Sequence, residues 1–395
     1  MLTLGGKVQH HNLLNDNEER FLLLTLTNNK NLPEILRDQY AFIVNSNDEL
    51  VPDGFRHYLV IDNYKNKNIP FLIEKSHSIL PNDYLYLSEG DIIRLIPEES
   101  SIRVLFRKKS NHNSILVTEQ CNHYCLMCSQ PPKKRDDSWI LDEIEQLIPL
   151  IPRNTHEIGF TGGEPTTNPE RFLSIMNLVK SYLPHTAIHI LSNGRTFADP
   201  KFSQNYAKID LHNSMVGIPI YSDTPEIHDY IVQADGAFDE TIRGIINLKK
   251  FRQNVELRVV LHKISIERLI PLCEFIARNL LFVNQVALMG LEMMGFTRAN
   301  LKDLWIDPFE YKDILSKAVH ILNSYGIKVL IYNHQLCLIN DDVREFYVKS
   351  ISDWKNEYAD ECHDCLALNE CGGFFSSGIK YGYSKHLVPF LKSDR

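Results

Sequence analysis

The chain begins with short alternating runs of apolar residues and changes, near residue 113, to apolar runs separated by amphipathic stretches. The early runs are Phe21 to Leu26, Tyr40 to Val44, His57 to Asp62 and Ile102 to Phe106. Turn signals such as Pro52-Asp53-Gly54 separate them. Residues 1–112 are therefore predicted to form a small, mostly β domain with one short helical stretch, Leu32 to Asp38.

From Ile115 onward, predicted strands alternate with predicted helices. The strands are 115–118, 157–161, 187–192, 215–220, 255–262 and 284–290, and the helices lie near 140–151, 169–183, 238–251 and 266–280. This alternation is typical of βαβ units and a parallel sheet. Six units predict an α/β fold, a partial (β/α)6 barrel over residues 113–305, with its chemistry at the carboxyl ends of the strands.

The last part of the chain, residues 306–395, is predicted to be a cysteine-rich extension. It opens with a helix near 308–325 and a strand from Ile327 to Tyr332. The linker between the first two parts is predicted at Ser110 to Ser114.

The role of the N-terminal part stays open between two possibilities. It could bind a peptide substrate or a partner by strand addition to an exposed sheet edge. Alternatively, it could simply pack against one end of the catalytic region. His10, His11, His57, His77 and His112 show no ligand spacing, so they are interpreted as ordinary surface or satisfied histidines.

The composition narrows the class of protein. Of 395 residues, 44% are hydrophobic and 23% are charged, as in ordinary soluble proteins. The net charge of -8 argues against a nucleic-acid surface. The sequence contains no secretory signal and no apolar run long enough to span a membrane. We therefore expect a cytoplasmic enzyme.

Three of the eight cysteines follow the first core strand as Cys121, Cys125 and Cys128, a CxxxCxxC spacing. Thiolates hold iron–sulfur clusters, which ordinarily take four cysteine ligands. A loop with three would leave one iron free to bind a small molecule. Zinc is an alternative, whereas disulfides fit poorly because the set is odd and the compartment is expected to be reducing.

This spacing resembles the radical S-adenosylmethionine (SAM) superfamily. The resemblance implies that Cys121, Cys125 and Cys128 hold a [4Fe–4S] cluster whose open iron chelates SAM. Gly162, Gly163 and Glu164 match the motif that binds the SAM amino group. By the same resemblance, Ser192, Asn193 and Ser222 are SAM contacts, and Met289, in the stretch that ends the sixth strand, is an adenine contact. Many members have an aromatic residue before the third cysteine, where this chain has Met127.

Three further points come from the residues of the core. Arg258 stands in an otherwise apolar strand, so it needs a partner, and its guanidinium could pair with the SAM carboxylate. His228 and Asp229 are expected to order the loop after the fourth strand. Cys273, in a helical pattern, is expected to be a buried small hydrophobe.

A second cysteine group comprises Cys362, Cys365 and Cys371, and Cys337 would complete four thiolates. Four are enough for one cluster or one zinc site. Peptide-modifying radical SAM enzymes carry a similar C-terminal extension, called a SPASM or Twitch domain. This resemblance implies one auxiliary [4Fe–4S] cluster, with His363 and Asp364 in its outer shell.

Whole segments, among them NSILVTEQCNHYCLMCSQPPK, GFTGGEPT and CGGFFSSG, are similar to the His-Xaa-Ser system radical SAM maturases of the HxsC type. The similarity implies an enzyme that cleaves SAM to a 5′-deoxyadenosyl radical and modifies a His-Xaa-Ser-type peptide. Its partners would be a second radical SAM protein of the HxsB type and an electron donor such as flavodoxin or ferredoxin. Two alternatives remain, namely another protein or cofactor precursor as substrate, and a non-catalytic iron–sulfur subunit of a heterodimer.

Overall fold

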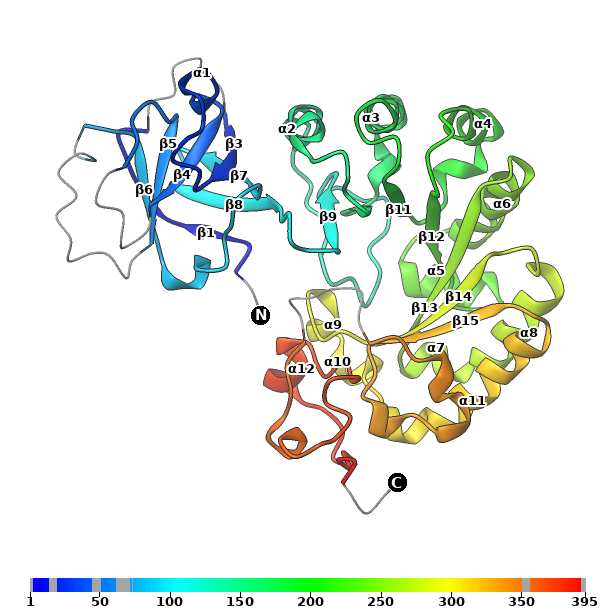
Figure 1. The fold of residues 1–395 in the computed structure, drawn as a ribbon. Coiled ribbons are helices and arrows are strands. Elements are labelled where there is room, and N and C mark those ends of the chain that lie inside the picture. The colour runs from blue at the N-terminus through cyan, green and yellow to red at the C-terminus, as the bar shows by residue number, and fades with distance from the viewer. Residues whose placement is uncertain are drawn as a thin grey trace.

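The computed structural model describes residues 3–13, 20–44, 51–61, 72, 74–349 and 356–391. Its N-terminal part holds one eight-stranded sheet (Figure 1). The strands are β1 (Gly5–Lys7), β2 (Gln9–His11), β3 (Leu22–Thr27), β4 (Tyr40–Val44), β5 (His57–Ile61), β6 (His77–Leu80), β7 (Ile92–Ile96) and β8 (Ser101–Phe106). Asp62, the predicted end of β5, lies outside the described residues. The predicted helix shortens to α1 (Glu34–Arg37).

This sheet closes on itself. Its strand order is β1-β8-β7-β3-β4-β5-β6-β2, and the two end strands are separated in sequence only by Val8. The extended stretch 5–11 therefore pairs with β8 through its first half and with β6 through its second half. Among the described strands the sheet offers no long exposed edge. Strand addition to this sheet, one of the two roles considered above, therefore has no support in its topology.

The N-terminal histidines are less scattered than the sequence suggested. His57 is fully buried, and its Nδ1 and Nε2 lie 2.8 Å from Ser76 Oγ and 2.6 Å from Ser78 Oγ. His10 Nδ1 lies 2.6 Å from the same Ser78 hydroxyl. Desolvation by burial lowers the pKa of His57 to about 3, so this imidazole is neutral. His57 is thus a satisfied core histidine rather than a surface one.

The core is a seven-stranded, fully parallel sheet, ordered β15-β14-β13-β12-β11-β10-β9. The strands are β9 (Asn113–Leu116), β10 (Glu157–Thr161), β11 (Ala187–Leu191), β12 (Met215–Pro219), β13 (Asn254–Leu261), β14 (Gln285–Gly290) and β15 (Lys328–Tyr332). Six strands ending by residue 305 were predicted. β15 was assigned to the extension, but it pairs in parallel with β14 and so continues the core sheet.

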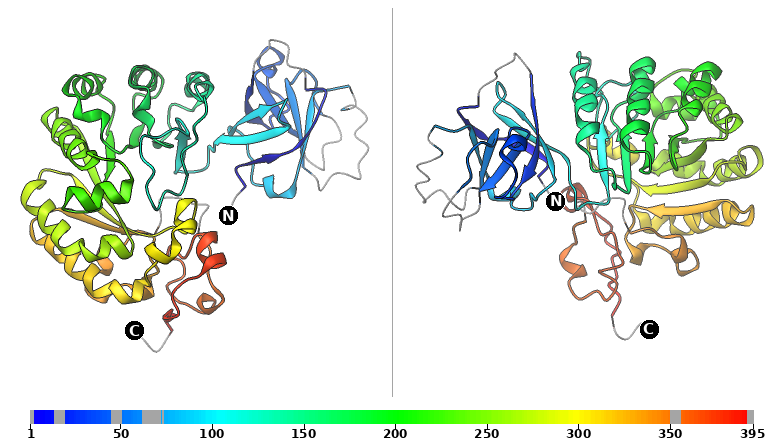
Figure 2. Two further views of the ribbon diagram at one scale, coloured as in Figure 1. Left: turned by 180° about the vertical axis from the view of Figure 1, so that it is seen from behind. Right: turned by 45° about the horizontal axis from the view of Figure 1, so that its top comes forward.

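Helices cover the outer, convex face of this sheet (Figures 1 and 2). They are α2 (Trp139–Leu147), α3 (Pro169–Tyr182), α4 (Pro200–Lys208), α6 (Ala237–Lys250), α7 (Lys263–Glu267), α8 (Leu269–Asn279) and α11 (Pro308–Ser324). The core also contains α5 (Pro225–Val232), α9 (Phe296–Ala299) and α10 (Leu301–Leu304), and residues of α5 and α10 pack in the buried cluster that contains Met127. None of the described helices is long and apolar enough to cross a membrane.

Side chains alternate between the helix-covered face and the concave face of the core sheet. Val255, Leu257 and Val259 are buried in the main hydrophobic cluster with the helices. Glu256 and Arg258 point to the opposite, concave face, because side chains alternate along a strand. The concave face is therefore polar in the middle of the sheet.

Several predicted boundaries differ from the structure for local reasons. α4 and α5 were not predicted; α4 is short and largely polar, and both begin with a proline at the first helical turn. The predicted helix 266–280 is split between α7 and α8, because Pro271 cannot donate the backbone bond that a continuous helix needs. β9 starts earlier than predicted because Asn113 is buried and held in place. Its side-chain oxygen accepts from the Arg107 backbone N–H, and its side-chain amide donates to the Arg107 carbonyl.

The C-terminal segment after β15 contains little regular structure. It comprises the 3-10 turns η7 (Leu336–Leu338), η8 (Asp341–Phe346) and η9 (Asp360–Cys362) and the helix α12 (Ser376–Tyr381). In both views this segment lies below the core, near α9 and α10 (Figures 1 and 2).

Phe160 on β10 is fully buried against the helices. We expect Phe160→Ala to lower the free energy of unfolding by about 3–5 kcal/mol, because it removes a packed ring and leaves a cavity. Urea unfolding followed by circular dichroism would measure this. Phe282→Ala, at a phenylalanine that is 43% exposed, is the matched control and should change little. Equal effects of the two substitutions would contradict this packing.

Candidate functional site

The three loop cysteines lie together at the carboxyl end of β9. The pKa of Cys121 is raised to about 12, first by burial, and the neighbouring Cys128 contributes to the rise. Burial also raises the pKa of Cys125, and both other thiols add to this effect. Backbone bonds from Tyr124 to Val232 and from Leu126 to Ile231 attach the loop to α5. Among the described residues, no three His, Cys, Asp or Glu side chains are grouped to hold a single metal ion.

Gly162 and Gly163 follow β10 and pack directly onto the cysteine loop. A Cβ on Gly163 would lie 2.0 Å from the Gln120 carbonyl oxygen, and one on Gly162 would lie 2.3 Å from that of Thr118. Gly162 also has φ +145, which favours glycine. From the sequence, these glycines were expected to belong to the SAM-binding motif. In the structure they let two protein loops approach each other.

Glu164, which is 1% exposed, connects this turn to the loop after β11. Its Oε1 accepts hydrogen bonds from the Thr166 backbone, the Thr166 hydroxyl and the Ser192 hydroxyl, the last at 2.8 Å. Its Oε2 accepts one from the Asn193 backbone N–H at 2.6 Å. Burial raises the pKa of Glu164, and these donors oppose the rise. Glu164 and Ser192, both expected to contact SAM, thus contact each other.

Asn193 joins the same set of loops. Its side-chain amide donates to Asn122 Oδ1 at 2.6 Å, and Asn122 directly follows Cys121. Its backbone carbonyl accepts from the Thr241 hydroxyl on α6. The loops after β9, β10 and β11 are therefore hydrogen-bonded to one another.

Ser222 and Tyr221 follow β12. Ser222 is fully buried, and its hydroxyl lies 3.2 Å from both the hydroxyl and the backbone nitrogen of Thr224, so its contacts in the structure are local. Tyr221 was not selected from the sequence, although it belongs to the same buried cluster as Met127 and Cys125. Burial raises its pKa well above the usual value, and the nearby Cys125 and Cys128 add to the effect. Met127 packs in this cluster.

Arg258 has the partner that its sequence environment required. Its Nη1 donates to Glu256 Oε1 at 2.8 Å, and Gln285 donates to the other carboxylate oxygen. Burial alone would raise the pKa of Glu256, but the interactions with His189 and Arg258 hold it at about 2. This charged group lies on the concave face of the sheet. Met289 is buried on the same face of β14, in register with Tyr332 of β15.

The segment after β14 covers the cysteine loop, which the sequence analysis did not foresee. The backbone N–H of Phe296 donates to the Cys128 carbonyl at 2.8 Å. Thr297 and Asn300 donate from their side chains to the carbonyls of Met127 and Leu126. These contacts use backbone acceptors on the loop, so no residue pairing in the sequence could have signalled them.

Three buried histidines surround this region: His123, His228 and His262. Each has an Nε2 atom without a hydrogen-bond partner among the described residues. Burial lowers the pKa of His228 and of His262 to about 4, so both imidazoles are neutral at pH 7. His228 Nδ1 accepts from the Tyr221 backbone, and the carboxylate of Asp229 accepts from the backbones of Gly236 and Phe238. The His-Asp pair therefore makes the loop contacts that were expected of it.

The four C-terminal cysteines line one cavity, although Cys337 is far from the others in sequence. Backbone N–H groups of Leu336 and Gly373 lie 3.5 and 3.4 Å from Cys371 Sγ. Burial raises the pKa of Cys337, and the nearby Cys371 and Cys362 contribute. His363 and Asp364 are about 88% exposed and pair with each other, outside the cavity lining.

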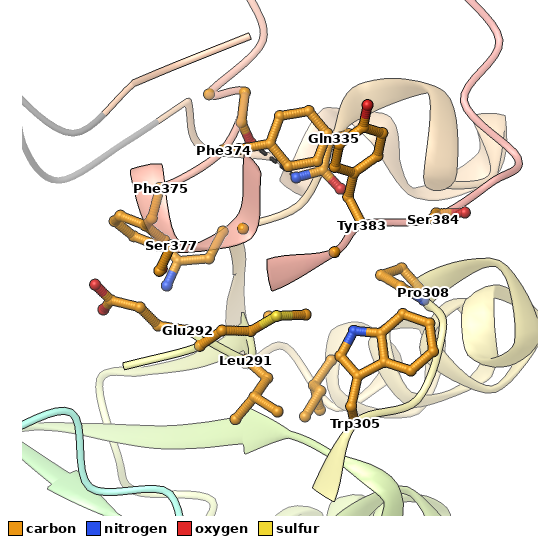
Figure 3. A pocket seen from close by; sticks show the side chains of 18 of the residues that line it. Leu291, Glu292, Trp305, Pro308, Gln335, Phe374, Phe375, Ser377, Tyr383 and Ser384 are labelled. Atoms are coloured by element: carbon orange, nitrogen blue, oxygen red, sulfur yellow. Dashed lines mark hydrogen bonds between the residues drawn. The ribbon is translucent and has the colours of Figure 1, made fainter. Parts of the chain in front are cut away.

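A second pocket lies between the core and the C-terminal segment (Figure 3). Its core side includes Leu291, Glu292 and Trp305, beyond the carboxyl ends of β13 and β14. Phe374, Phe375 and Tyr383 line the opposite side. Gln335, Gly373 and Phe374 belong both to this pocket and to the cysteine cavity, and Gln335 donates to the Gly373 carbonyl at 2.8 Å. The pocket therefore adjoins the second cysteine group.

Comparison with known proteins gives the class of the core. Residues 115–276 match the family model of the radical SAM superfamily. No curated protein matches the chain. Streptococcus suis SuiB bound to S-adenosylmethionine is 12% identical, with a TM-score of 0.45, over 63% of this chain and 54% of its own. Native anSMEcpe with bound AdoMet is 16% identical, with a TM-score of 0.44, over 55% of this chain and 62% of its own.

The chain thus spans about half the length of SuiB. The match of residues 115–276 to the radical SAM family model implies a [4Fe–4S] cluster and SAM for this region.

We expect Gly163→Ala to reduce the iron bound by the cysteine loop, because the added Cβ would displace the backbone next to Cys121. Iron analysis after anaerobic reconstitution would measure the loss. Gly6→Ala, where the nearest atom is the Tyr84 hydroxyl at 3.3 Å, is the control. Unchanged iron content in Gly163→Ala would contradict the close packing of the two loops.

Glu256 should make stability depend on pH in acid. Its carboxyl has a pKa of about 2 in the folded chain and about 4.5 when unfolded, so the ionised form stabilises the fold at neutral pH by on the order of 3 kcal/mol. That contribution is present above about pH 4.5 and is lost as the pH falls toward about 2. We expect Glu256→Gln to lower stability at pH 7 and to flatten its decline in acid. Urea unfolding between about pH 7 and 3 tests this, and parallel curves would contradict it.

Proposed function

We propose, from the radical SAM domain that this chain carries, that the protein is a maturase that modifies a ribosomally made peptide. The observation that carries the proposal is the arrangement of two cysteine groups. One group lies on the loop after β9, and the other lines a cavity that adjoins the pocket between the core and the C-terminal segment. A radical enzyme with a single cofactor site would need only the first group.

The first group fits a cluster with one open iron. Cys121, Cys125 and Cys128 provide three soft ligands, whose raised pKa values mean that binding iron must displace protons from buried thiols. Backbone hydrogen bonds to α5 and to the segment after β14 hold the cysteine loop in place. When bound and reduced, such a cluster supplies the electron that cleaves SAM to methionine and a 5′-deoxyadenosyl radical.

SAM would bind at the carboxyl ends of β10 to β14. We assign its contacts to Gly162, Gly163, Glu164, Ser192, Asn193, Ser222, Arg258 and Met289. The internal bonds of Glu164 occupy most of its acceptor capacity, so its main contribution would be to hold the backbone of the two neighbouring loops in place. Arg258 uses one nitrogen on Glu256, which leaves donors of its fork for a carboxylate.

The second group would hold one auxiliary [4Fe–4S] cluster through Cys337, Cys362, Cys365 and Cys371. Their common cavity supports this ligand set. The backbone N–H groups near Cys371 would stabilise a thiolate there, and hydrogen bonds to cluster sulfurs tune the reduction potential. Such a cluster could accept the electron left when a substrate radical closes to product.

The pocket between the core and the C-terminal segment is the proposed substrate site. Aromatic walls and a few polar groups, among them Glu292 and Gln335, suit a side chain of a peptide held beside the second cysteine group. In finer detail, we propose a His-Xaa-Ser-type peptide, a partner of the HxsB type, and flavodoxin or ferredoxin as the electron donor in the cytoplasm. These finer assignments rest on the sequence resemblance.

The test is anaerobic reconstitution with iron and sulfide, followed by SAM, dithionite and a co-expressed His-Xaa-Ser peptide. We expect 5′-deoxyadenosine and a mass change on the peptide, and we expect Cys125→Ala to abolish both. A variant lacking all three loop cysteines should keep about half of the iron. Cys273→Ala, at a fully buried cysteine of α8, is the matched control and should keep both activity and iron.

The experiment distinguishes failure of the catalytic proposal from failure of the substrate assignment. No 5′-deoxyadenosine from the reconstituted protein, even with an HxsB-type partner present, would overturn the catalytic proposal and favour a non-catalytic subunit. Cleavage of SAM without any change to the peptide would overturn the substrate assignment alone.

A further inference from the structure

A cleft lined by arginines separates the N-terminal sheet from the core. It is lined by Arg94 and Arg103 of β7 and β8, by Ser114 and Leu116 of β9, and by Trp139 and Glu143 of α2. In Figure 1, β9 is the core strand nearest to the N-terminal part. The cleft is distinct from the pocket proposed for the reacting side chain.

One side of the cleft is an unpaired strand edge. β9 is the last strand of the core sheet and pairs only with β10 among the described strands. The Val117 N–H points to β10, where it donates to the Thr161 carbonyl at 2.8 Å. N–H groups alternate sides along a strand, so those of Ser114 and Leu116 point away from β10, toward the cleft. Ser114 is exposed and Leu116 is half-buried, so the edge can be reached.

The cleft also has uncompensated positive charge. Arg94 pairs with Glu143 at 2.6 Å, and Arg135 pairs with Glu119 at 2.5 Å. In the described part of the chain, the guanidinium of Arg103 makes no ion pair or hydrogen bond. Arg20 lies 4.5 Å from the Trp139 ring centroid, and its charge also acts on the exposed carboxyl of Asp136. Among the described residues that line the cleft, Arg20 and Arg103 then remain with one further carboxylate, Glu99, in a protein whose net charge is -8.

Desolvation in the cleft and the charge of Arg94 lower the pKa of Arg103, while the nearby carboxylates of Glu143 and Glu119 act in the opposite direction. Arginine nevertheless stays charged at pH 7, and its planar fork binds carboxylates in a bidentate manner. A carboxylate in the cleft would relieve this repulsion.

We infer that this cleft binds an extended, acidic segment of the peptide substrate, which adds as a strand to the free edge of β9 while its carboxylates pair with Arg103 and Arg20. The inference rests on the proposed function for the identity of the ligand as a substrate peptide. Main-chain bonds would supply affinity, and the arginines would select acidic side chains on alternate residues. β9 leads straight into the Cys121 loop, so a segment bound there would bring the following residues toward the site.

Two labelled probe peptides test the charge requirement by fluorescence anisotropy. One is a short blocked peptide of alternating glutamate and valine, and the other has glutamine in place of glutamate. We expect the acidic peptide to bind more tightly, and we expect Arg103→Gln to weaken its binding about tenfold, as for the loss of one charge-assisted bond. Arg153→Gln, at an exposed arginine away from the cleft, is the matched control. Equal affinity for the two peptides, or an unchanged affinity in Arg103→Gln, would overturn the inference.

N-methylation of the acidic peptide tests strand addition. Methyl groups on one set of alternate amides should abolish binding, while methyl groups on the other set should not, because only one set faces β9. Equal binding of the two methylated peptides would exclude strand addition. Arg103→Gln should leave SAM cleavage without peptide unchanged. If the wild-type protein does not cleave SAM, that result counts against the proposed function. Peptide binding is measured separately and does not depend on it.

Discussion

The buried carboxylate of Glu164 and the two glycines before it hold the site together. Taking a carboxylate out of water costs several kcal/mol unless donors replace the lost hydration. Glu164 accepts four hydrogen bonds from residues on two loops, and the glycines bring its turn against the cysteine loop. These bonds hold the turn after β10 to the loop after β11, and the glycines pack that turn on the loop after β9, so the three loops are held in one mutual arrangement. This arrangement fixes the backbone of the cysteine loop and therefore the positions of its thiols.

The parallel sheet explains why these loops meet. All seven strands run in one direction, so their carboxyl ends share one edge. The helices bury the apolar face, and the concave face keeps the Glu256–Arg258 pair. The C-terminal segment adds a second group of thiols beside the pocket, and the N-terminal sheet adds a cleft next to β9. The N-terminal sheet thus flanks the core at β9, and the C-terminal segment lies beyond the carboxyl ends of β13 and β14.

Much of the site could be predicted because its signals are local in sequence. The spacing of Cys121, Cys125 and Cys128 is itself the feature that brings three thiols together, and each later candidate follows a strand with a clear apolar pattern. The partner of Arg258 was also within reach, since Glu256 is two residues away on the same face of a strand. Tyr221 was missed because its contact with the cysteine loop depends on packing rather than on spacing.

Other features depend on contacts that a sequence pattern does not encode. The closure of the N-terminal sheet rests on two strands of three residues each, which are too short to give a periodic signal. The role of β15 as the seventh core strand follows from its pairing with β14. The grouping of Cys337 with the later cysteines depends on how the segment after β15 folds back.

The central claim is that the loop after β9 carries a cluster with an open iron, separate from the second cysteine group. Electron paramagnetic resonance of the dithionite-reduced protein, recorded with and without SAM, tests it most directly. The account predicts that SAM changes the spectrum of the wild-type protein and of a variant lacking Cys362, Cys365 and Cys371. A spectrum that SAM leaves unchanged in both proteins would contradict it.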